Sequence, residues 1–351
     1  MLKVIIIGDQ HFKVDNIEEV DLFISKVEEV VSNIKPDFVV LLGDLLDTHE
    51  RIHSVPLNRA YKFINTIRNI CRTFVIVGNH DMEHNGVYLE SKHWLNALKE
   101  WDNVTIVDKV IYEIIDEKKF IFSPYVYVGR FEEALNTLDT EWKDSKCIFA
   151  HQEFYGCKMG AFNSIDGDKW DVDFPNVISG HIHLNQKPQK NIYYPGSSLS
   201  VAFGETAKNI IAKLEFNNNE KEYILDEIEL ELPKKKIIYI NSEEVDNIDI
   251  PKTEDKIKLS ISGEYEEFKT FKKTKKYKEL TSKGIKVVFK PKKKELKNKK
   301  ENIQKTIDNN PNDFNLILKD IIDREKNSYL FEAYELVVNS KEINPDDIFF
   351  L

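Results

Sequence analysis

The sequence is poor in cysteine and has no long hydrophobic run. Its three cysteines, Cys71, Cys147 and Cys157, cannot all pair and lack metal-ligand spacing, so we expect reduced thiols, with Cys71 and Cys147 in the core. No apolar stretch approaches the roughly 20 residues that span a bilayer. The apolar start ends at Asp9, too soon for a signal peptide. We therefore expect an intracellular protein that is not secreted and has no membrane contact.

Two further absences narrow the class of protein. The sequence has no internal repeat, which argues against a repeat protein, and no glycine-rich phosphate loop, which argues against a nucleotide-binding domain of that type. What is present, 41% hydrophobic and 31% charged residues over 351 positions, is typical of a soluble globular protein. The length predicts one large domain with one or two smaller units.

Charge is distributed unevenly along the chain. The net charge is −10, but residues 252–300 hold 18 lysines against seven acidic residues, a local charge of +11, so the rest of the chain carries −21. The overall charge argues weakly against a nucleic-acid partner, whereas the basic segment favours one.

The first eighty residues alternate between apolar runs and amphipathic segments. Residues 2–7, 38–42 and 73–77 are short apolar runs, which predict buried strands. Between them, residues 17–34 and 57–70 carry apolar side chains at helical spacing. This alternation predicts right-handed βαβ crossovers and a largely parallel central sheet.

Shorter strands are predicted farther along, after a helix-like segment at 90–100 and on either side of a helix near 130–141. The strand-like runs are 104–107, 110–115, 119–123, 146–150, 175–179, 193–201, 210–216 and 223–232. We predict that this half forms a second sheet, mixed or antiparallel. Two facing sheets with outer helices would make a four-layer α/β/β/α sandwich over residues 1–232.

A small basic module and a tail complete the predicted organisation. Residues 233–291 contain a strand, a lysine-rich helical segment at 264–282 and another strand, which predicts a βαβ capping module. A run of Lys, Glu and Asn then predicts a solvated linker over 292–310. Residues 311–351 regain an apolar pattern and predict one or two C-terminal helices that need a surface to bury against.

Five polar stretches each follow a short apolar run. In open α/β sheets, ligands bind at the carboxyl ends of strands, so these loops are candidates for one converging metal site. They are Gly8-Asp9-Gln10-His11, Gly43-Asp44-Leu45-Leu46-Asp47, Gly78-Asn79-His80-Asp81, His151, and Gly180-His181-Ile182-His183. Any one of them alone is more typical of a turn or a polar surface pair, but five together favour a metal site.

The residue types suit a pair of divalent metals. Carboxylate, carboxamide and imidazole together favour Mn²⁺, Fe²⁺ or Zn²⁺ over Mg²⁺ or Ca²⁺, which prefer all-oxygen sites. Asp9 and His11 are two residues apart and can hold one ion, His181 and His183 can address two ions, and Asp44 is the natural bridge.

The order and the residue types of the five stretches resemble the motifs of the calcineurin-like metallophosphoesterases, and the resemblance covers about residues 1–215. Tyr194-Pro195-Gly196-Ser197-Ser198 followed by Ala202-Phe203-Gly204-Glu205 resembles SbcD-type DNA-repair nucleases. So does the order of capping module, linker and terminal helices, a plan that the phage recombination-endonuclease small subunit shares. The first motif departs from the family, because Gln10 and Phe12-Lys13 replace an aromatic or small residue and Leu-Gly. These residues are not ligands, so the departure concerns substrate contacts rather than metal binding.

The resemblance implies a set of site residues. One manganese would be held by Asp9, His11, Asp44 and His183, and a second by Asp44, Asn79, His151 and His181, with Mg²⁺, Fe²⁺ or Zn²⁺ as substitutes. His80 corresponds to the catalytic histidine of the family, and Asp47 and Asp81 correspond to residues that orient their neighbours. His80 would stabilise the transition state or protonate the leaving oxygen, with Asp81 or a backbone group as its partner. We expect the other histidines, His49, His53, His84 and His93, to be solvated, although His49 and His53 lie close enough to the second motif for substrate contact.

The resemblance also implies partners. DNA would contact the basic module through Lys269, Lys272, Lys273 and Lys276, although a general lysine bias would produce the same pattern. The C-terminal helices would dock on an SbcC-type, SMC-like ATPase, and the chain would form a homodimer.

The implied function is a manganese-dependent DNA nuclease for repair and recombination, acting as a 3′–5′ exonuclease and a single-strand endonuclease. Two alternatives stay open. One is a phosphatase or phosphodiesterase for small molecules or proteins, and the other is a non-catalytic scaffold.

Overall fold

The structure is a computed structural model that divides into two compact units, Met1–Lys290 and Pro291–Leu351. It describes residues 1–49, 51–84, 86, 88–160, 162–204, 208–217, 222–250, 253–291, 314–325, 330–331 and 334.

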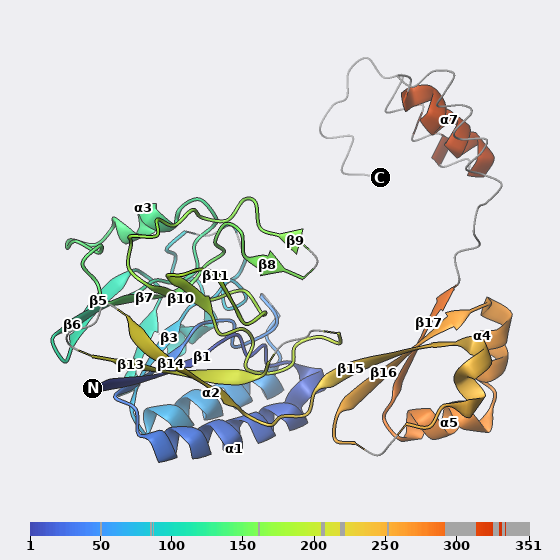
Figure 1. Ribbon diagram of the computed structural model, residues 1–351, viewed down its shortest axis with the longest axis horizontal. Coiled ribbons are helices and arrows are strands. Elements are labelled where there is room, and N and C mark those ends of the chain that lie inside the picture. Colours follow the sequence, from blue (N-terminus) through green and yellow to red (C-terminus); the bar gives the residue numbers. More distant parts are fainter. Residues whose placement is uncertain are drawn as a thin grey trace. The chain divides into compact units, whose positions relative to one another are not determined.

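The first sheet of the larger unit contains the predicted parallel strands (Figure 1). Its strand order is β14-β13-β1-β2-β3-β4. The parallel strands are β1 (Leu2–Ile7), β2 (Phe38–Leu41), β3 (Arg72–Ile76) and β4 (Val104–Val107). The helices α1 (Ile17–Ile34) and α2 (Ser54–Arg68) connect the first three of them, so the predicted βαβ crossovers are confirmed.

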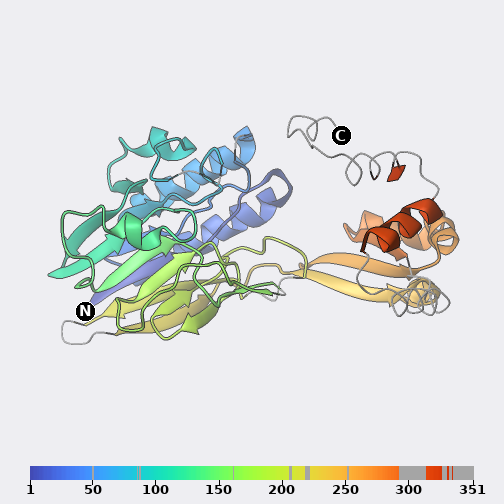
Figure 2. The same cartoon turned by 90° about the horizontal axis from the view of Figure 1, so that it is seen from above.

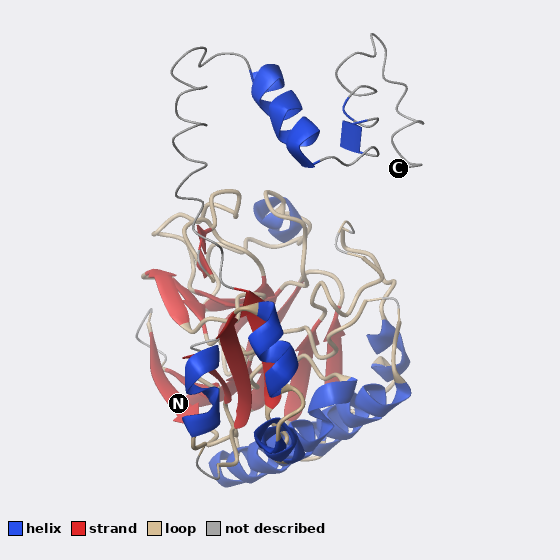
Figure 3. Ribbon diagram, turned by 90° about the vertical axis from the view of Figure 1, so that its right-hand side faces the viewer, coloured by secondary structure: helices blue, strands red, loops and turns tan. Residues whose placement is uncertain are grey.

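Strand β1 is buried on both faces because its side chains alternate between two cores. Ile5 and Ile7 pack toward α1 and α2, and Val4 and Ile6 pack toward the second sheet. Figure 3 shows α1 and α2 along the outer face of the strands.

The second sheet faces the first across an aromatic core. Its strand order is β11-β12-β10-β7-β6-β5. These strands are β5 (Ile111–Ile115), β6 (Lys118–Phe122), β7 (Cys147–His151), β10 (Val177–Gly180), β11 (Gln186–Gln189) and β12 (Ile192–Tyr194). Between the sheets, Phe74 and Phe122 stack with ring centroids 4.0 Å apart. The short helix α3 (Phe131–Leu135) and loops that carry Trp142 and Trp170 cover the outer face, which completes the four-layer α/β sandwich.

Several local predictions were wrong. The strands β4, β13 (Ile210–Phe216) and β14 (Tyr223–Glu229) belong to the first sheet rather than to the second. Strand β13 pairs antiparallel with β1 and so covers an edge that would otherwise expose unpaired backbone groups.

Three other predicted elements are shorter than expected. The predicted helix at 90–100 is a single 3₁₀ helix, η2 (Trp94–Leu98), and the helix near 130–141 is reduced to the five residues of α3. The predicted strand at 193–201 ends with β12, because Pro195 and Gly196 follow, the latter with a φ of 79°.

The cysteines are free thiols, as expected. Cys147 lies in the core, as predicted, whereas Cys71 is only partly buried against it. Cys157, for which we predicted no core position, is buried beneath the outer face of the second sheet. Burial raises the pKa of both Cys71 and Cys157 to about 11.

The basic module is a three-stranded sheet in the order β15-β16-β17, with helices on one side (Figure 2). Its elements are β15 (Lys235–Asn241), η3 (Ser242–Asn247), β16 (Lys256–Gly263), α4 (Tyr265–Phe271), α5 (Lys275–Ser282) and β17 (Lys286–Pro291). The predicted single helix is two helices, because the Thr274 side chain accepts the Tyr277 amide and starts α5. Leu259, Phe268 and Leu280 belong to the module's own core.

The smaller unit contains α7 (Phe314–Glu325), one of the predicted C-terminal helices. Leu330, Phe331 and Tyr334 are also helical. The predicted linker at 292–310 and the remainder of the tail lie outside the described residues. Within the described part of the chain, every helix is too short or too polar to cross a bilayer.

Candidate metal centre

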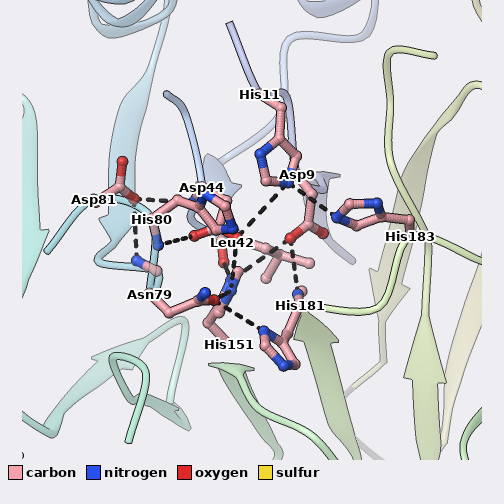
Figure 4. A network of polar contacts seen from close by, with 12 residues as sticks. Asp9, His11, Leu42, Asp44, Asn79, His80, Asp81, His151, His181 and His183 are labelled. Atoms are coloured by element: carbon pink, nitrogen blue, oxygen red, sulfur yellow. Dashed lines mark hydrogen bonds and ion pairs between the residues drawn. The ribbon is translucent and has the colours of Figure 1, made fainter. Parts of the chain in front are cut away.

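The seven predicted ligands converge at the carboxyl ends of β1, β2 and β3 of the first sheet and of β7 and β10 of the second (Figure 4). Both sheets therefore contribute to one site, as expected for loops at strand ends. Three groups of ligand atoms each lie within 4.8 Å of one another: Asp9, His11 and His183; His11, Asp44 and His80; and Asp44, His151 and His181.

The first group leaves a buried acceptor unsatisfied. Asp9 Oδ1 accepts the His181 amide at 2.8 Å, but Asp9 Oδ2 is buried without a hydrogen-bond partner. His11 Nε2 and His183 Nε2 face each other at 3.0 Å. A buried carboxylate oxygen without a donor is costly, and a cation between these atoms would offset that cost.

The third group, Asp44, His151 and His181, is arranged around Asn79. Its side-chain oxygen lies 3.0 Å from His151 Nε2 and 2.9 Å from His181 Nδ1. Because the Leu42 carbonyl oxygen can only accept, His151 Nδ1 donates to it at 2.7 Å and His151 Nε2 is directed at the site.

Asp44 lies between the first and third groups. Its Oδ2 atom is 3.3 Å from His151 Nε2 and 3.7 Å from His11 Nε2. Its Oδ1 atom accepts the His80 amide at 2.8 Å. This position is compatible with the bridging role predicted for Asp44.

Backbone strain accompanies the site. His11, Asp44 and His181 have φ values of 46°, 51° and 79°, in the left-handed region that side-chain-bearing residues rarely adopt. Each such residue costs about 1–3 kcal/mol and persists only where surrounding contacts hold it. Three strained residues among the ligand candidates indicate that the loops are shaped for the site rather than for stability.

Glycines give these loops the space to approach one another. A Cβ atom on Gly78 would lie 2.2 Å from Asp44 Oδ1, and one on Gly180 would lie 2.8 Å from His151 Nδ1. Any side chain at these two positions would displace a ligand candidate, which explains why Gly78 and Gly180 precede their polar stretches.

Asp81 supports the loops through both carboxylate oxygens. Oδ2 accepts the amides of Asp44 at 2.9 Å and Gly78 at 3.1 Å, and Oδ1 accepts the Trp94 indole N–H at 3.0 Å. Burial and the nearby Asp44 carboxylate raise the pKa of Asp81 to about 6. Asp47, the other predicted supporting residue, has its Oδ1 atom 3.5 Å from His11 Nδ1.

His80 is held by the backbone and by a second imidazole. Its Nδ1 atom donates to the Asp47 carbonyl oxygen at 2.9 Å, so its partner is a backbone group rather than Asp81. The His49 ring stacks on it, with centroids 4.5 Å apart and an angle of 22° between the planes. We predicted that His49 would be solvated, but it is partly buried, and its Nδ1 atom lies 3.0 Å from the Asn79 carbonyl oxygen.

Sequence reasoning missed other residues near the site. The Tyr125 ring lies 5.5 Å from that of His181, and Glu153 Oε2 lies 3.9 Å from His181 Nε2. The prediction of a solvated His93 was wrong, because this buried residue contacts Asp108. His53 and His84 are exposed, as predicted. For His49, its closeness to Asp47 in the sequence was a usable signal of a place near the site. The contacts of Tyr125, Glu153 and His93 depend on the fold and have no such signal.

The charges of the site influence one another strongly. Burial alone would raise the pKa of Asp44, but His151 and His11 outweigh it and hold that pKa well below the usual value. Burial alone would lower the pKa of His151, but the Asp44 and Asp9 carboxylates raise it to about 9. Burial raises the pKa of Asp9 and lowers that of His11. Two buried carboxylates among imidazoles form a donor set that fits divalent transition metals.

The lysines predicted to bind DNA are in the basic module, and their contacts lie within it. Lys269 and Lys276 pair with Glu266 and Glu279 at 3.7 Å and 4.0 Å. Lys272 lies over the Phe268 ring, and Lys273 is exposed.

Comparison with known proteins identifies relatives of the chain. The calcineurin-like phosphoesterase family matches residues 2–185. "Putative phosphoesterase 078R" of Invertebrate iridescent virus 3 is 48% identical over 82% of this chain and 84% of its own length. "Putative phosphoesterase 244L" of Invertebrate iridescent virus 6 is 50% identical over 78% of this chain and 98% of its own length. A solved archaeal phosphodiesterase is 18% identical, with a TM-score of 0.35, over 65% of this chain and all of that one.

Proposed function

Because this chain belongs to the calcineurin-like phosphoesterase family and is a metal-dependent hydrolase of phosphate esters, we propose that its substrate is DNA. The proposed activity is that of a nuclease of the SbcD type, with exonuclease and single-strand endonuclease action. The observation that supports a hydrolytic activity most directly is the convergence of ligand-type side chains from five strand-end loops, with His80 beside them. The choice of DNA is supported by the lysine-rich module and by the order of domain, module and tail.

The residues that would hold metals are those of the first and third groups, with Asp44 shared and Asn79 added to the third. Asp9, His11, Asp44 and His183 would hold one ion, and Asp44, Asn79, His151 and His181 the other, with manganese as the proposed metal. When bound, such metals lower the pKa of a water molecule and neutralise charge on the phosphate.

Neighbouring residues would orient His80 for a proton transfer. The Asp47 carbonyl oxygen accepts a hydrogen bond from His80 Nδ1, so Nε2 is the nitrogen that can deliver a proton to a substrate. We propose that it protonates the leaving oxygen as the phosphorus–oxygen bond breaks, which prevents an unstable alkoxide from forming. The stacked His49 ring limits rotation of the imidazole and so positions this nitrogen.

Two partner proposals follow from the tail and from the family resemblance. The C-terminal helices, of which α7 is described, would dock on an SMC-like ATPase in a helix-in-groove manner. Co-purification with such an ATPase before and after deletion of residues 311–351 tests this. We also propose a homodimer, and light scattering of the full chain gives its mass in solution.

One digestion experiment tests the proposed function. Linear duplex DNA and circular single-stranded DNA are incubated with the chain and Mn²⁺, with EDTA and His80→Ala as controls. The proposal predicts cleavage of both DNAs that EDTA abolishes and that His80→Ala strongly reduces. Hydrolysis of nitrophenyl phosphate without cleavage of DNA would instead favour a small-molecule phosphatase. Failure on every substrate, together with the absence of bound metal, would favour a scaffold.

A further inference from the structure

The metal centre is partly exposed at three of its histidines. These are His80, His181 and His183, whereas the other predicted ligands are buried. A substrate must therefore reach the centre past these three side chains. Any further group that contacts the substrate has to lie on this open side.

Tyr125 lies on the open side of the centre, beside His181. It follows β6 of the second sheet, and its amide donates to the Val77 carbonyl oxygen at 2.9 Å, just beyond β3 of the first sheet. The centroid of its ring is 5.5 Å from that of His181 and 6.1 Å from that of His151. Both sheets therefore hold this phenol against the candidate ligands.

The Tyr125 hydroxyl has no hydrogen-bond partner among the described residues. Buried phenols usually have one. Tyr193 donates to Glu227 Oε1, and Tyr194 donates to the Gln152 carbonyl oxygen, both at 2.9 Å. Tyr125 is 6% exposed, and its hydroxyl is not one of the buried atoms that lack a partner. The small accessible part of the residue therefore includes the hydroxyl, which is free to contact a ligand.

The hydroxyl is an uncharged donor in acidic surroundings. Burial, together with the carboxylates of Glu153 and Asp44, raises the pKa of Tyr125 to about 12. A phenol keeps its proton at neutral pH, so it can donate a hydrogen bond to an oxygen that carries negative charge. A donor that is already in place stabilises the charge that develops on such an oxygen in a transition state. The oxygens of a phosphate ester are acceptors of this kind.

We propose that the Tyr125 hydroxyl donates a hydrogen bond to a non-bridging oxygen of the phosphate ester, while His80 protonates the leaving oxygen. The hydroxyl keeps its proton throughout. The His80 ring lies 4.9 Å from that of His11, whereas Tyr125 contacts His181 and His151, so the two groups would act from different parts of the site. The inference rests on the proposed hydrolytic role of the site and does not depend on DNA as the substrate.

The first test measures phosphate binding apart from turnover. Tyr125→Phe removes only the hydroxyl and retains the ring beside His181. Tyr127→Phe is the matched control, because Tyr127 lies in the same segment and is 55% exposed. The full-length chains are loaded with Mn²⁺, bound metal is measured by elemental analysis, and the affinity for inorganic phosphate is measured by calorimetry. Thermal unfolding confirms that all chains are folded.

We expect Tyr125→Phe to bind inorganic phosphate about tenfold more weakly than the wild type, because a hydrogen bond to a charged group is lost. Its metal content should not change, and the control should bind phosphate as the wild type does. An affinity equal to that of the control, or no phosphate binding by the wild type, would overturn the proposal. A loss of manganese would also overturn it, since Tyr125 would then support the ligands rather than contact the substrate.

The second test uses two esters to separate the role of Tyr125 from that of His80. Methyl nitrophenyl phosphate has a good leaving group, and methyl phenyl phosphate has a poor one. A proton donor matters more for the poor leaving group, so His80→Ala should lose more turnover on the phenyl ester. A donor to a non-bridging oxygen acts on both esters alike. We expect Tyr125→Phe to lower kcat/KM by about ten- to hundredfold on each of them. A loss that grows with the poorer leaving group would overturn the proposal.

Failure of this inference can be told apart from failure of the proposed function. If the wild type hydrolyses both esters but not DNA, the choice of DNA fails and the assignment of Tyr125 is decided by its own variants. If the wild type hydrolyses DNA and Tyr125→Phe matches the control, only the assignment of Tyr125 fails. If the wild type hydrolyses none of these substrates, the proposed hydrolysis fails, and phosphate affinity still decides whether the hydroxyl contacts the anion.

Discussion

The His49 ring stacks on the His80 ring, and His49 also contacts the backbone of Asn79, the residue before His80. One imidazole therefore positions another at the candidate site. We predict that His49→Ala lowers the turnover of bis(nitrophenyl) phosphate by about tenfold or more, since a misplacement of about 1 Å can cost about 10²-fold. His49→Phe, which retains a stacking ring, should recover part of the loss. His53→Ala is the control, because His53 is exposed in the same loop. Equal turnover by His49→Ala and His53→Ala would remove the positioning role.

His80→Ala should lose most turnover while it retains bound metal. General acid catalysis contributes about 10²–10⁴-fold, and we expect a loss in that range. Because a ligand atom of His80 lies within 4.8 Å of ligand atoms of His11 and Asp44, His80 could also be a metal ligand. Elemental analysis of the same sample measures its bound metal and so separates a catalytic role from a ligand role. Turnover at the wild-type rate would contradict the assignment, and a loss of metal would make His80 a ligand.

Trp94→Phe removes the indole donor from Asp81 Oδ1. A hydrogen bond to a charged group contributes about 1.5–3 kcal/mol, so we predict a loss of unfolding free energy of that order, measured by urea denaturation. Trp101→Phe is a matched control, because both indoles pack against Tyr61, with centroids 5.9 Å and 6.2 Å from it. If the two substitutions cost the same, the indole N–H of Trp94 contributes nothing specific.

Asp108 predicts a pH dependence of stability away from the metal centre. The His93 hydrogen bond, with help from Lys99, lowers the pKa of Asp108 to about 2. Because this folded-state pKa lies below the unfolded value, the contribution to stability is present above about pH 4 and is lost as pH falls toward 2. Asp108→Asn should therefore cost about 1–2 kcal/mol at neutral pH, after allowance for solvent screening, and much less at low pH.

Urea denaturation of Asp108→Asn at pH 7 and pH 3 checks this. The exposed Asp144, which pairs with Lys119 at 2.7 Å, provides the control Asp144→Asn, for which we expect a small effect at both pH values. A cost for Asp108→Asn that does not change with pH would contradict the ion-pair account.

Local sequence patterns predicted the elements whose burial is uniform. The strands at 2–7, 38–42 and 73–77, which are buried on both faces, and the helix at 17–34, which is buried on one face, agree with the structure because burial determines the pattern. The five polar stretches also indicated where the sheets end, and the structure brings their side chains together.

The remaining features depend on contacts between distant parts of the chain. The pattern of residues 210–216 predicts a strand but not its partner, and pairing with β1 in the first sheet is a consequence of topology. The contacts of Trp94 with Asp81 and of His93 with Asp108 likewise join residues 13 and 15 positions apart whose spacing carries no signal. The lysine-rich helix divided in two at Thr274, a capping residue that helical periodicity alone does not reveal.

Manganese binding tests the central claim most directly. After loading and dialysis, metal per chain is measured by elemental analysis in the wild type and in Asp44→Ala, which removes the proposed bridge. The account predicts about two manganese ions per wild-type chain, a marked loss in Asp44→Ala, and a manganese-dependent gain in thermal stability, about 2.7 kcal/mol at a metal concentration of about 100 times Kd. A wild-type chain that retains no metal, or phosphoester hydrolysis that survives EDTA, would contradict it.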